Sequence, residues 1–172
     1  MSALTCCPSV QRAVQSHKMT FSAAIPFDWD DKLLVGQGQM DEEHKEFMVL
    51  IDGLRRAADD VLAESLDVVV HHATHHFAQE DQWMTQLGFP ARQCHMDEHS
   101  AVLRSASAIQ QRMRAGDLAA ARVFAQELSA WFPAHVQHLD SALAAWICKS
   151  TWNAKPLVFH RRDRMNAVAV PT

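Results

Sequence analysis

The stretch from His71 to Met84 constrains the fold more than any other part of the chain. It holds four histidines and two adjacent carboxylates, and its spacing predicts a helix. Two of its polar residues, His76 and Glu80, are four positions apart, so on a helix they lie one turn apart on the same face. The positions that share this face at 3.6 residues per turn are Val69, Ala73, His76, Glu80, Trp83 and Leu87.

An imidazole or a carboxylate on an apolar, inward-facing stripe requires a partner. Burial of such a group without one costs on the order of several kcal/mol, so buried polar groups are usually paired or bound to a metal. We therefore expect this helix to face a polar or metallic centre inside the protein.

Three further segments show the same helical spacing of apolar residues. Helices are predicted from near Asp41, over residues 66–87, over 90–114 and over 117–149, with Pro133 expected to distort the last of them. The connections between them contain glycine or proline and are short. This pattern favours an all-α fold, an up-down-up-down antiparallel four-helix bundle.

Every predicted helix carries histidine on its apolar stripe. A single internal histidine is more often an ordinary core or boundary residue, and His-x-x-x-His pairs also arise by chance on surface helices. Histidines on all four stripes form a constellation instead. The other three stripes are Met40, His44, Phe47, Ile51, Leu54 and Val61; His95, His99, Val102, Ala106, Ile109 and Met113; and Phe124, Leu128, Trp131, His135, Leu139, Ala142 and Trp146.

Length and charge limit the class of protein. The 172 residues suit one domain, with the bundle at residues 25–149, an N-terminal extension at 1–24 and a C-terminal tail at 150–172. The net charge of −4 provides no general basic field for nucleic acid or for an anionic membrane. A protein partner is not indicated by the sequence.

The sequence shows no clear targeting signal. No stretch approaches the roughly 20 apolar residues of a membrane span, and the N-terminus lacks the apolar run of a signal peptide. The four cysteines have no Cys-x-x-Cys spacing. We therefore expect a soluble, cytoplasmic protein with reduced thiols.

The predicted internal donors are mainly nitrogen atoms. Five imidazoles with Glu80 suit iron, zinc or copper and do not suit magnesium or calcium. Five histidines are too many for one tetrahedral zinc, so two metals that share the set are the better interpretation. A ferritin-like di-iron site requires Glu-x-x-His motifs, and the chain has none.

Four motifs follow one another along the chain: Asp41-x-x-His44, His76-Phe77-x-x-Glu80-Asp81, His95-x-x-x-His99 and Trp131-Phe132-x-x-His135-Val136-x-x-x-Asp140. Their order closely resembles the hemerythrin family, in particular its bacterial members. The resemblance covers about residues 25 to 145 and fills all seven ligand positions of the family.

The resemblance implies a non-haem di-iron centre. Three histidines on one iron and two on the other would leave the second iron an open coordination position. The implied ligands are His95, His99 and His135 on one iron, His44 and His76 on the other, and Glu80 and Asp140 as bridges together with an oxo or hydroxo group.

Asp140 depends on the resemblance alone. It follows His135 by five residues and so lies about 140° away on an ideal helix. A helical wheel would have preferred His138. We expect a distortion downstream of Pro133 to bring Asp140 inward.

The implied function is reversible binding of dioxygen for storage, delivery or sensing, and not enzymatic turnover. The family's apolar oxygen pocket corresponds to Trp131, Phe132 and Val136, although plain core packing is the alternative for these residues. A di-iron peroxidase, an oxidase or a nitric-oxide-handling enzyme on the same site is the alternative function. A metal-dependent sensor module and a metal-free histidine phosphotransfer bundle are two further hypotheses.

Two neighbours of the predicted ligands have alternative roles. His72 stands where the family more often has tyrosine, and it is either a hydrogen-bond donor behind the site or simply partly exposed. We expect the latter. Asp81 is expected to be the outward member of the acidic pair that it forms with Glu80.

Overall fold

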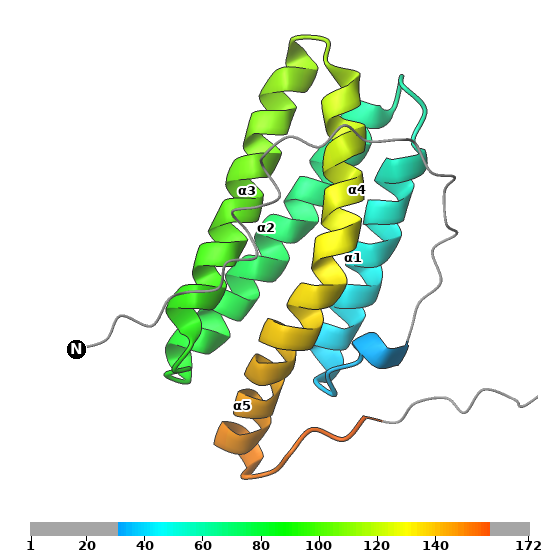
Figure 1. The fold of residues 1–172 in the computed structure, drawn as a ribbon. Coiled ribbons are helices and arrows are strands. Elements are labelled where there is room, and N and C mark those ends of the chain that lie inside the picture. Colours follow the sequence, from blue (N-terminus) through cyan, green and yellow to red (C-terminus); the bar gives the residue numbers. More distant parts are fainter. Residues whose placement is uncertain (1–30, 159–172) are drawn as a thin grey trace, which may run out of the picture.

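Helices make up nearly all of the described chain. The computed structural model describes residues 31–158, and within this range it contains helices and no strand. Figure 1 shows the long helices side by side, each antiparallel to the next, and the predicted all-α four-helix bundle is confirmed. The elements are η1 (Asp31–Leu33), α1 (Gly38–Arg56), α2 (Leu62–Gln86), α3 (Arg92–Arg114), α4 (Leu118–His135), η2 (Val136–Asp140) and α5 (Ser141–Trp152).

The predicted extension over residues 1–24 lies outside the described residues, as does the part of the predicted tail beyond residue 158. The described part of the tail contacts the bundle. A Cβ atom on Gly36 would lie 3.0 Å from the Cβ of Pro156, and Gly36 has a φ of +77°. Glycine is therefore required where the chain after α5 passes the turn before α1.

Asp41 fixes this turn to the start of α1. Its carboxylate accepts hydrogen bonds from the backbone N–H groups of Val35 (2.7 Å) and Gly36 (3.1 Å). The same carboxylate lies in the first turn of α1, where a negative charge also suits the helix dipole. The entry into α1 is thus tied down just before the turn that carries His44.

The predicted apolar stripe of α1 is buried, with one exception. Met40, His44, Phe47, Ile51 and Leu54 are all at most 1% exposed. Val61 does not continue this stripe, because α1 ends at Arg56 and Val61 is a 44% exposed residue just before α2. Its spacing from Leu54 matched the helical period only by coincidence.

The predicted fourth helix is divided into three parts. A π-helical segment, η2, separates α4 from α5 and begins three residues after Pro133. In it the backbone N–H of Ser141 donates to the carbonyl of Val136, an i→i+5 bond that inserts one residue into the helical turn. The distortion expected downstream of Pro133 is confirmed.

The extra residue shifts the inward face of α5 by one position. The prediction placed Ala142 and Trp146 on the inner stripe, whereas the structure buries Leu143 and Ile147. Ala142 is exposed. The prediction was wrong here because it continued a regular 3.6-residue period through the π segment.

No helix within residues 31–158 has the length and apolar character to cross a membrane. A cytoplasmic location stays a prediction.

The two described cysteines differ. Cys148 is a free, buried thiol, but Cys94 is disulfide-bonded, so the expectation of reduced thiols is wrong for Cys94. Spacing along the chain does not reveal which cysteines approach each other in space.

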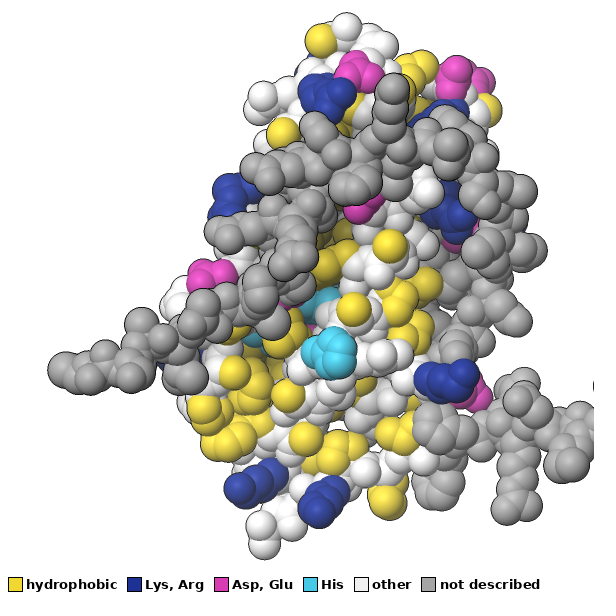
Figure 2. Space-filling model, in the orientation of Figure 1, with side chains coloured by type: hydrophobic (Ala, Val, Ile, Leu, Met, Phe, Trp, Pro, Cys, Tyr) yellow, Lys and Arg dark blue, Asp and Glu magenta, His cyan; other side chains and the backbone are white. Residues whose placement is uncertain are grey.

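Hydrophobic side chains are also present on the surface around α5 (Figure 2). Trp152 is 66% exposed and Leu157 is 77% exposed, the highest values among the large hydrophobic residues of the described chain. Both lie at the C-terminal end of the described chain, at α5 and just after it.

Candidate metal centre

Seven polar side chains converge inside the bundle. Each is at most 2% exposed, and they come from α1, α2, α3, α4 and η2. Polar groups are rarely buried in such number without a compensating partner. These seven are the residues that the sequence analysis predicted: His44, His76, Glu80, His95, His99, His135 and Asp140.

Their donor atoms form two overlapping groups. Within each group one donor atom from every residue lies within 4.8 Å of the others. Both carboxylates belong to both groups, whereas each histidine belongs to one. The three-histidine group contains Glu80, His95, His99, His135 and Asp140, and the two-histidine group contains His44, His76, Glu80 and Asp140.

Glu80 presents one oxygen to each group. Its Oε2 lies 3.2 Å from Nε2 of His99 and 3.6 Å from Nε2 of His95. Its Oε1 lies 3.8 Å from Nε2 of His76. The carboxylate therefore spans the two groups.

Asp140 does the same from η2. Its Oδ1 lies 3.1 Å from Nε2 of His95 and 3.2 Å from Nε2 of His135, and its Oδ2 lies 3.2 Å from Nε2 of His44. The wider winding of η2 aligns residues five apart, so Asp140 falls on the same face as His135. A regular helix would have turned this side chain away from the centre.

Three outer carboxylates hold three of the five imidazoles by their other nitrogen. A carboxylate only accepts, so the Nδ1 atom of each ring carries a proton, and in the neutral form the ring directs the lone pair of Nε2 inward. The pairs are Glu43 Oε2 with His76 Nδ1 (2.9 Å), Asp81 Oδ1 with His99 Nδ1 (2.8 Å) and Glu98 Oε2 with His135 Nδ1 (3.3 Å).

This arrangement leaves lone pairs facing one another. The Nε2 atoms of His99 and His135 are 3.3 Å apart, and when both rings are neutral neither has a proton left to place between them. Within residues 31–158, both oxygens of Glu80 and of Asp140 are buried without a hydrogen-bond partner, as is Nε2 of His76. A bound cation would satisfy all of these atoms at once, so the cluster suggests metal binding.

The electrostatics of the metal-free cluster agree. Burial raises the pKa of Glu80 and so does the Asp140 carboxylate, but neighbouring histidines, His76 foremost, bring it down to about 2. Burial lowers the pKa of His135, yet the carboxylates of Asp140 and Glu98 raise it to about 10. The inner carboxylates thus stay ionised and require positive charge beside them, from protons or from a metal.

Aromatic rings line the two groups differently. On the three-histidine side, the ring of Phe77 stacks on His99 at 4.1 Å, and Trp131 lies 4.4 Å from His135, centroid to centroid. Trp131 is half-buried. These rings cover the outer faces of the imidazoles.

On the two-histidine side, a phenyl ring and an imidazole meet in a T-shaped contact. Phe132 is fully buried and meets His44 edge-on at 5.4 Å and Phe47 at 4.8 Å, centroid to centroid. Val136 is also fully buried, at the start of η2. Of the three predicted pocket residues, Phe132 borders the two-histidine group and Trp131 borders the other.

The sequence analysis missed the outer carboxylates. Asp81 is 31% exposed but bonded to His99, so the prediction that it faces outward describes only part of its environment. His72 is half-buried and also donates to the carbonyl of Glu43 at 3.2 Å. One signal could have revealed the set, because each outer carboxylate is adjacent in sequence to an inner residue: Glu43 to His44, Asp81 to Glu80 and Glu98 to His99.

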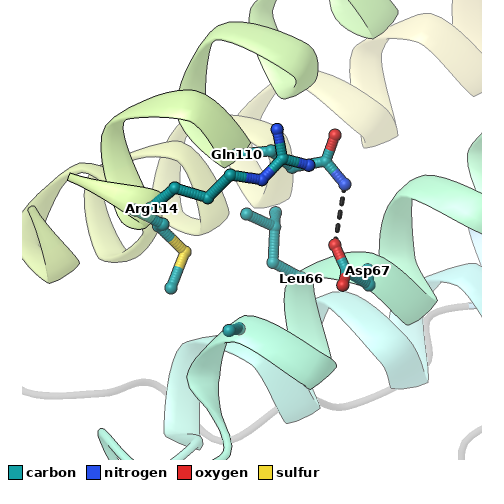
Figure 3. A pocket seen from close by; sticks show the side chains of 6 residues that line it. Leu66, Asp67, Gln110 and Arg114 are labelled. Atoms are coloured by element: carbon teal, nitrogen blue, oxygen red, sulfur yellow. Dashed lines mark hydrogen bonds between the residues drawn. The ribbon is translucent and has the colours of Figure 1, made fainter. Parts of the chain in front are cut away.

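A separate hollow of about 130 Å³ lies between the N-terminal end of α2 and the C-terminal end of α3, away from the seven residues. Figure 3 shows Gln110 donating to Asp67 across it, at 2.7 Å, with Arg114 extended beside them. It contains none of the predicted ligands. Its lining residues are Ala63, Leu66, Asp67, Gln110, Met113 and Arg114.

Comparison with known proteins agrees with the geometry. The family model described as the hemerythrin HHE cation binding domain matches residues 35–147, which is more than half of the chain. The chain belongs to the hemerythrin family. The resemblance inferred from the motifs is thereby confirmed, and the matched segment contains all seven inner residues.

Individual relatives support the same assignment. The chain is 31% identical over 121 residues to a bacteriohemerythrin of Ralstonia nicotianae, covering 70% of this chain and 88% of that protein. It is 26% identical over 120 residues to a bacteriohemerythrin of Stenotrophomonas maltophilia, covering 67% and 78%. A hemerythrin-like protein of Naegleria gruberi is 30% identical over 90 residues, covering 51% and 72%.

Proposed function

We propose that this hemerythrin-family protein binds dioxygen reversibly at a non-haem di-iron centre. The observation that supports this most is the unequal division of five histidines around two shared carboxylates. The proposed ligands are His95, His99 and His135 for one iron, His44 and His76 for the other, and Glu80 and Asp140 for both.

The donor set favours two ions with more than four ligands each. Imidazole and carboxylate donors together suit iron, and a single tetrahedral zinc would use fewer than half of the converging atoms. The two-histidine group has one imidazole fewer, so its ion would keep a position for an external ligand. Dioxygen is the ligand that the relatives' family suggests.

A bound pair of ferrous ions would supply the two electrons that dioxygen binding requires. The chain's own contribution is to exclude water from the centre. Phe132 is fully buried against His44, and Phe47 is fully buried against Phe132. Exclusion of water at this side favours reversible binding over side reactions.

The chain offers no separate group for turnover near the centre among its described residues. The outer carboxylates that approach it, those of Glu43, Asp81 and Glu98, each bond to a ligand imidazole. A binding protein is therefore favoured over a peroxidase, an oxidase or a nitric-oxide-handling enzyme on the same site.

Absorption spectra of the ferrous-loaded protein test the proposal. We expect a visible spectrum to appear when air is admitted and to disappear when oxygen is removed, through repeated cycles. Rapid bleaching with consumption of peroxide would instead favour the enzymatic alternative. A loaded protein whose spectrum does not respond to oxygen contradicts the proposal.

A further inference from the structure

Glu43 connects α1 to two histidines of α2. Its Oε2 accepts a hydrogen bond from Nδ1 of His76 at 2.9 Å, and its backbone carbonyl accepts one from Nε2 of His72 at 3.2 Å. The two histidines lie one turn apart on α2. One residue of α1 is thus held at two points by the helix that carries a proposed iron ligand.

Further contacts on α1 hold this residue in place. Gln39, one turn earlier, donates to Oε1 of Glu43 at 3.1 Å, so both carboxylate oxygens are engaged. Phe47, one turn later, stacks on His72 at 5.1 Å with an angle of 19° between the rings.

The side chain of Glu43 is only 17% exposed. Both of its carboxylate oxygens accept a hydrogen bond, one from Nδ1 of His76 and one from Gln39. Because a carboxylate oxygen accepts and does not donate, this contact directs the proton of the His76 ring to Nδ1.

The other histidine of this group lacks such support. Nδ1 of His44 is buried and forms no hydrogen bond within the described chain. In the three-histidine group, by contrast, two rings are fixed, by Asp81 and Glu98. Among residues 31–158, Glu43 is thus the only carboxylate that fixes an imidazole of the two-histidine group by its outer nitrogen.

We infer that Glu43 and His72 are positioning residues that orient His76 and set how fast the two-histidine group loses its ion. The inference rests on the proposed function. Metal-binding imidazoles commonly donate their second N–H to a carboxylate, and loss of that partner typically costs about 10- to 100-fold in metal affinity. The effect should be confined to one of the two ions.

Release of bound metal to a chelator provides the test, with Fe²⁺ and, as a spectroscopic substitute, Co²⁺. We expect two kinetic phases, and we expect Glu43→Ala to accelerate the faster one about 10- to 100-fold and to leave the slower one unchanged. Glu43→Gln keeps an acceptor for His76 and should stay within about fivefold of wild type. Glu42→Ala, at the exposed neighbouring position, is the matched control.

The role of His72 is tested in the same assay. His72→Phe keeps a ring to stack on Phe47 but removes the donor to the Glu43 carbonyl, so an acceleration of about three- to tenfold is expected. His71→Phe, at an exposed position of the same helix, serves as its control.

The outcomes separate this inference from the proposed function. Equal release rates for Glu43→Ala and Glu42→Ala overturn the inference and leave oxygen binding untouched. Release from Glu43→Gln as fast as from Glu43→Ala also overturns it, because charge and not orientation would then be responsible. Should Glu43→Ala not fold, the release rates of Glu43→Gln and His72→Phe test the inference in its place. If the wild type holds two cobalt ions but its ferrous-loaded form shows no oxygen-dependent spectrum, the proposed function fails and the cobalt release rates still decide the inference.

Discussion

The three-histidine and two-histidine groups share both inner carboxylates but differ in their surroundings. In the first, Phe77 stacks flat on His99 and Trp131 lies against His135, and outer carboxylates fix both imidazoles. In the second, His76 alone is fixed in this way by a residue of the described chain, and Phe132 makes a T-shaped contact with His44.

The difference separates two physical tasks. Stacked rings and outer carboxylates leave an imidazole one orientation, which suits an ion that must stay in place. Fewer donors and an apolar wall suit an ion that accepts an external ligand and needs water kept away. We therefore expect changes near Phe132 to alter oxygen chemistry and changes to shared residues to affect both ions.

The largest effect is expected from Asp140→Ala. The substitution removes a donor from both groups, so the iron content should fall from about two per chain to one or fewer. Metal analysis of the purified variant provides the measurement. Asp97→Ala, at an exposed position of α3, is the control and should keep its iron. Two tightly held irons in Asp140→Ala would show that Asp140 is not shared.

Phe132→Ala should affect the two-histidine group more than the three-histidine group. Loss of a fully buried phenyl ring costs about 3–5 kcal/mol of stability, which thermal unfolding measures. It should also admit water beside His44 and accelerate autoxidation of the oxygenated protein. Trp131→Ala, on the three-histidine side, should change the autoxidation rate less. An autoxidation rate unchanged in Phe132→Ala would count against its assignment to the oxygen pocket.

The smallest effect is expected from pH in the metal-free protein. The pKa of His135 is raised from 6.5 to about 10, so the folded state binds the extra proton and its stabilisation is lost as the pH rises through that range. The stabilisation gained from bound metal should instead increase with pH, because a metal competes with protons for the same nitrogen atoms.

Thermal unfolding at about pH 6 and about pH 9, with and without metal, measures this contrast. The melting temperature of the metal-free protein should fall between the two, while the gain from added metal should grow. Parallel trends in both forms would mean that protons and metal do not share the His135 site.

Helical spacing was sufficient to predict the bundle. The inner stripe of α1 and the proposed ligand pairs His76–Glu80 and His95–His99 follow from 3.6-residue periodicity, because each pair lies on a regular helix. The prediction failed at Val61, where a period continued past the end of a helix, and in α5, where the π segment shifted the face.

Other parts of the centre depend on the π segment or on contacts between helices, and regular helical spacing encodes neither. Asp140 was assigned only by resemblance to the family, since an ideal helix would have favoured His138, which the structure leaves exposed. The pairing of Glu98 on α3 with His135 on α4 likewise has no signature within either helix.

Anomalous scattering at the iron edge, from crystals of the iron-loaded protein, tests the central claim most directly. We expect two iron peaks per chain, one beside His95, His99 and His135 and the other beside His44 and His76, with Glu80 and Asp140 reaching both. A single peak, or two peaks that share neither carboxylate, would contradict the account.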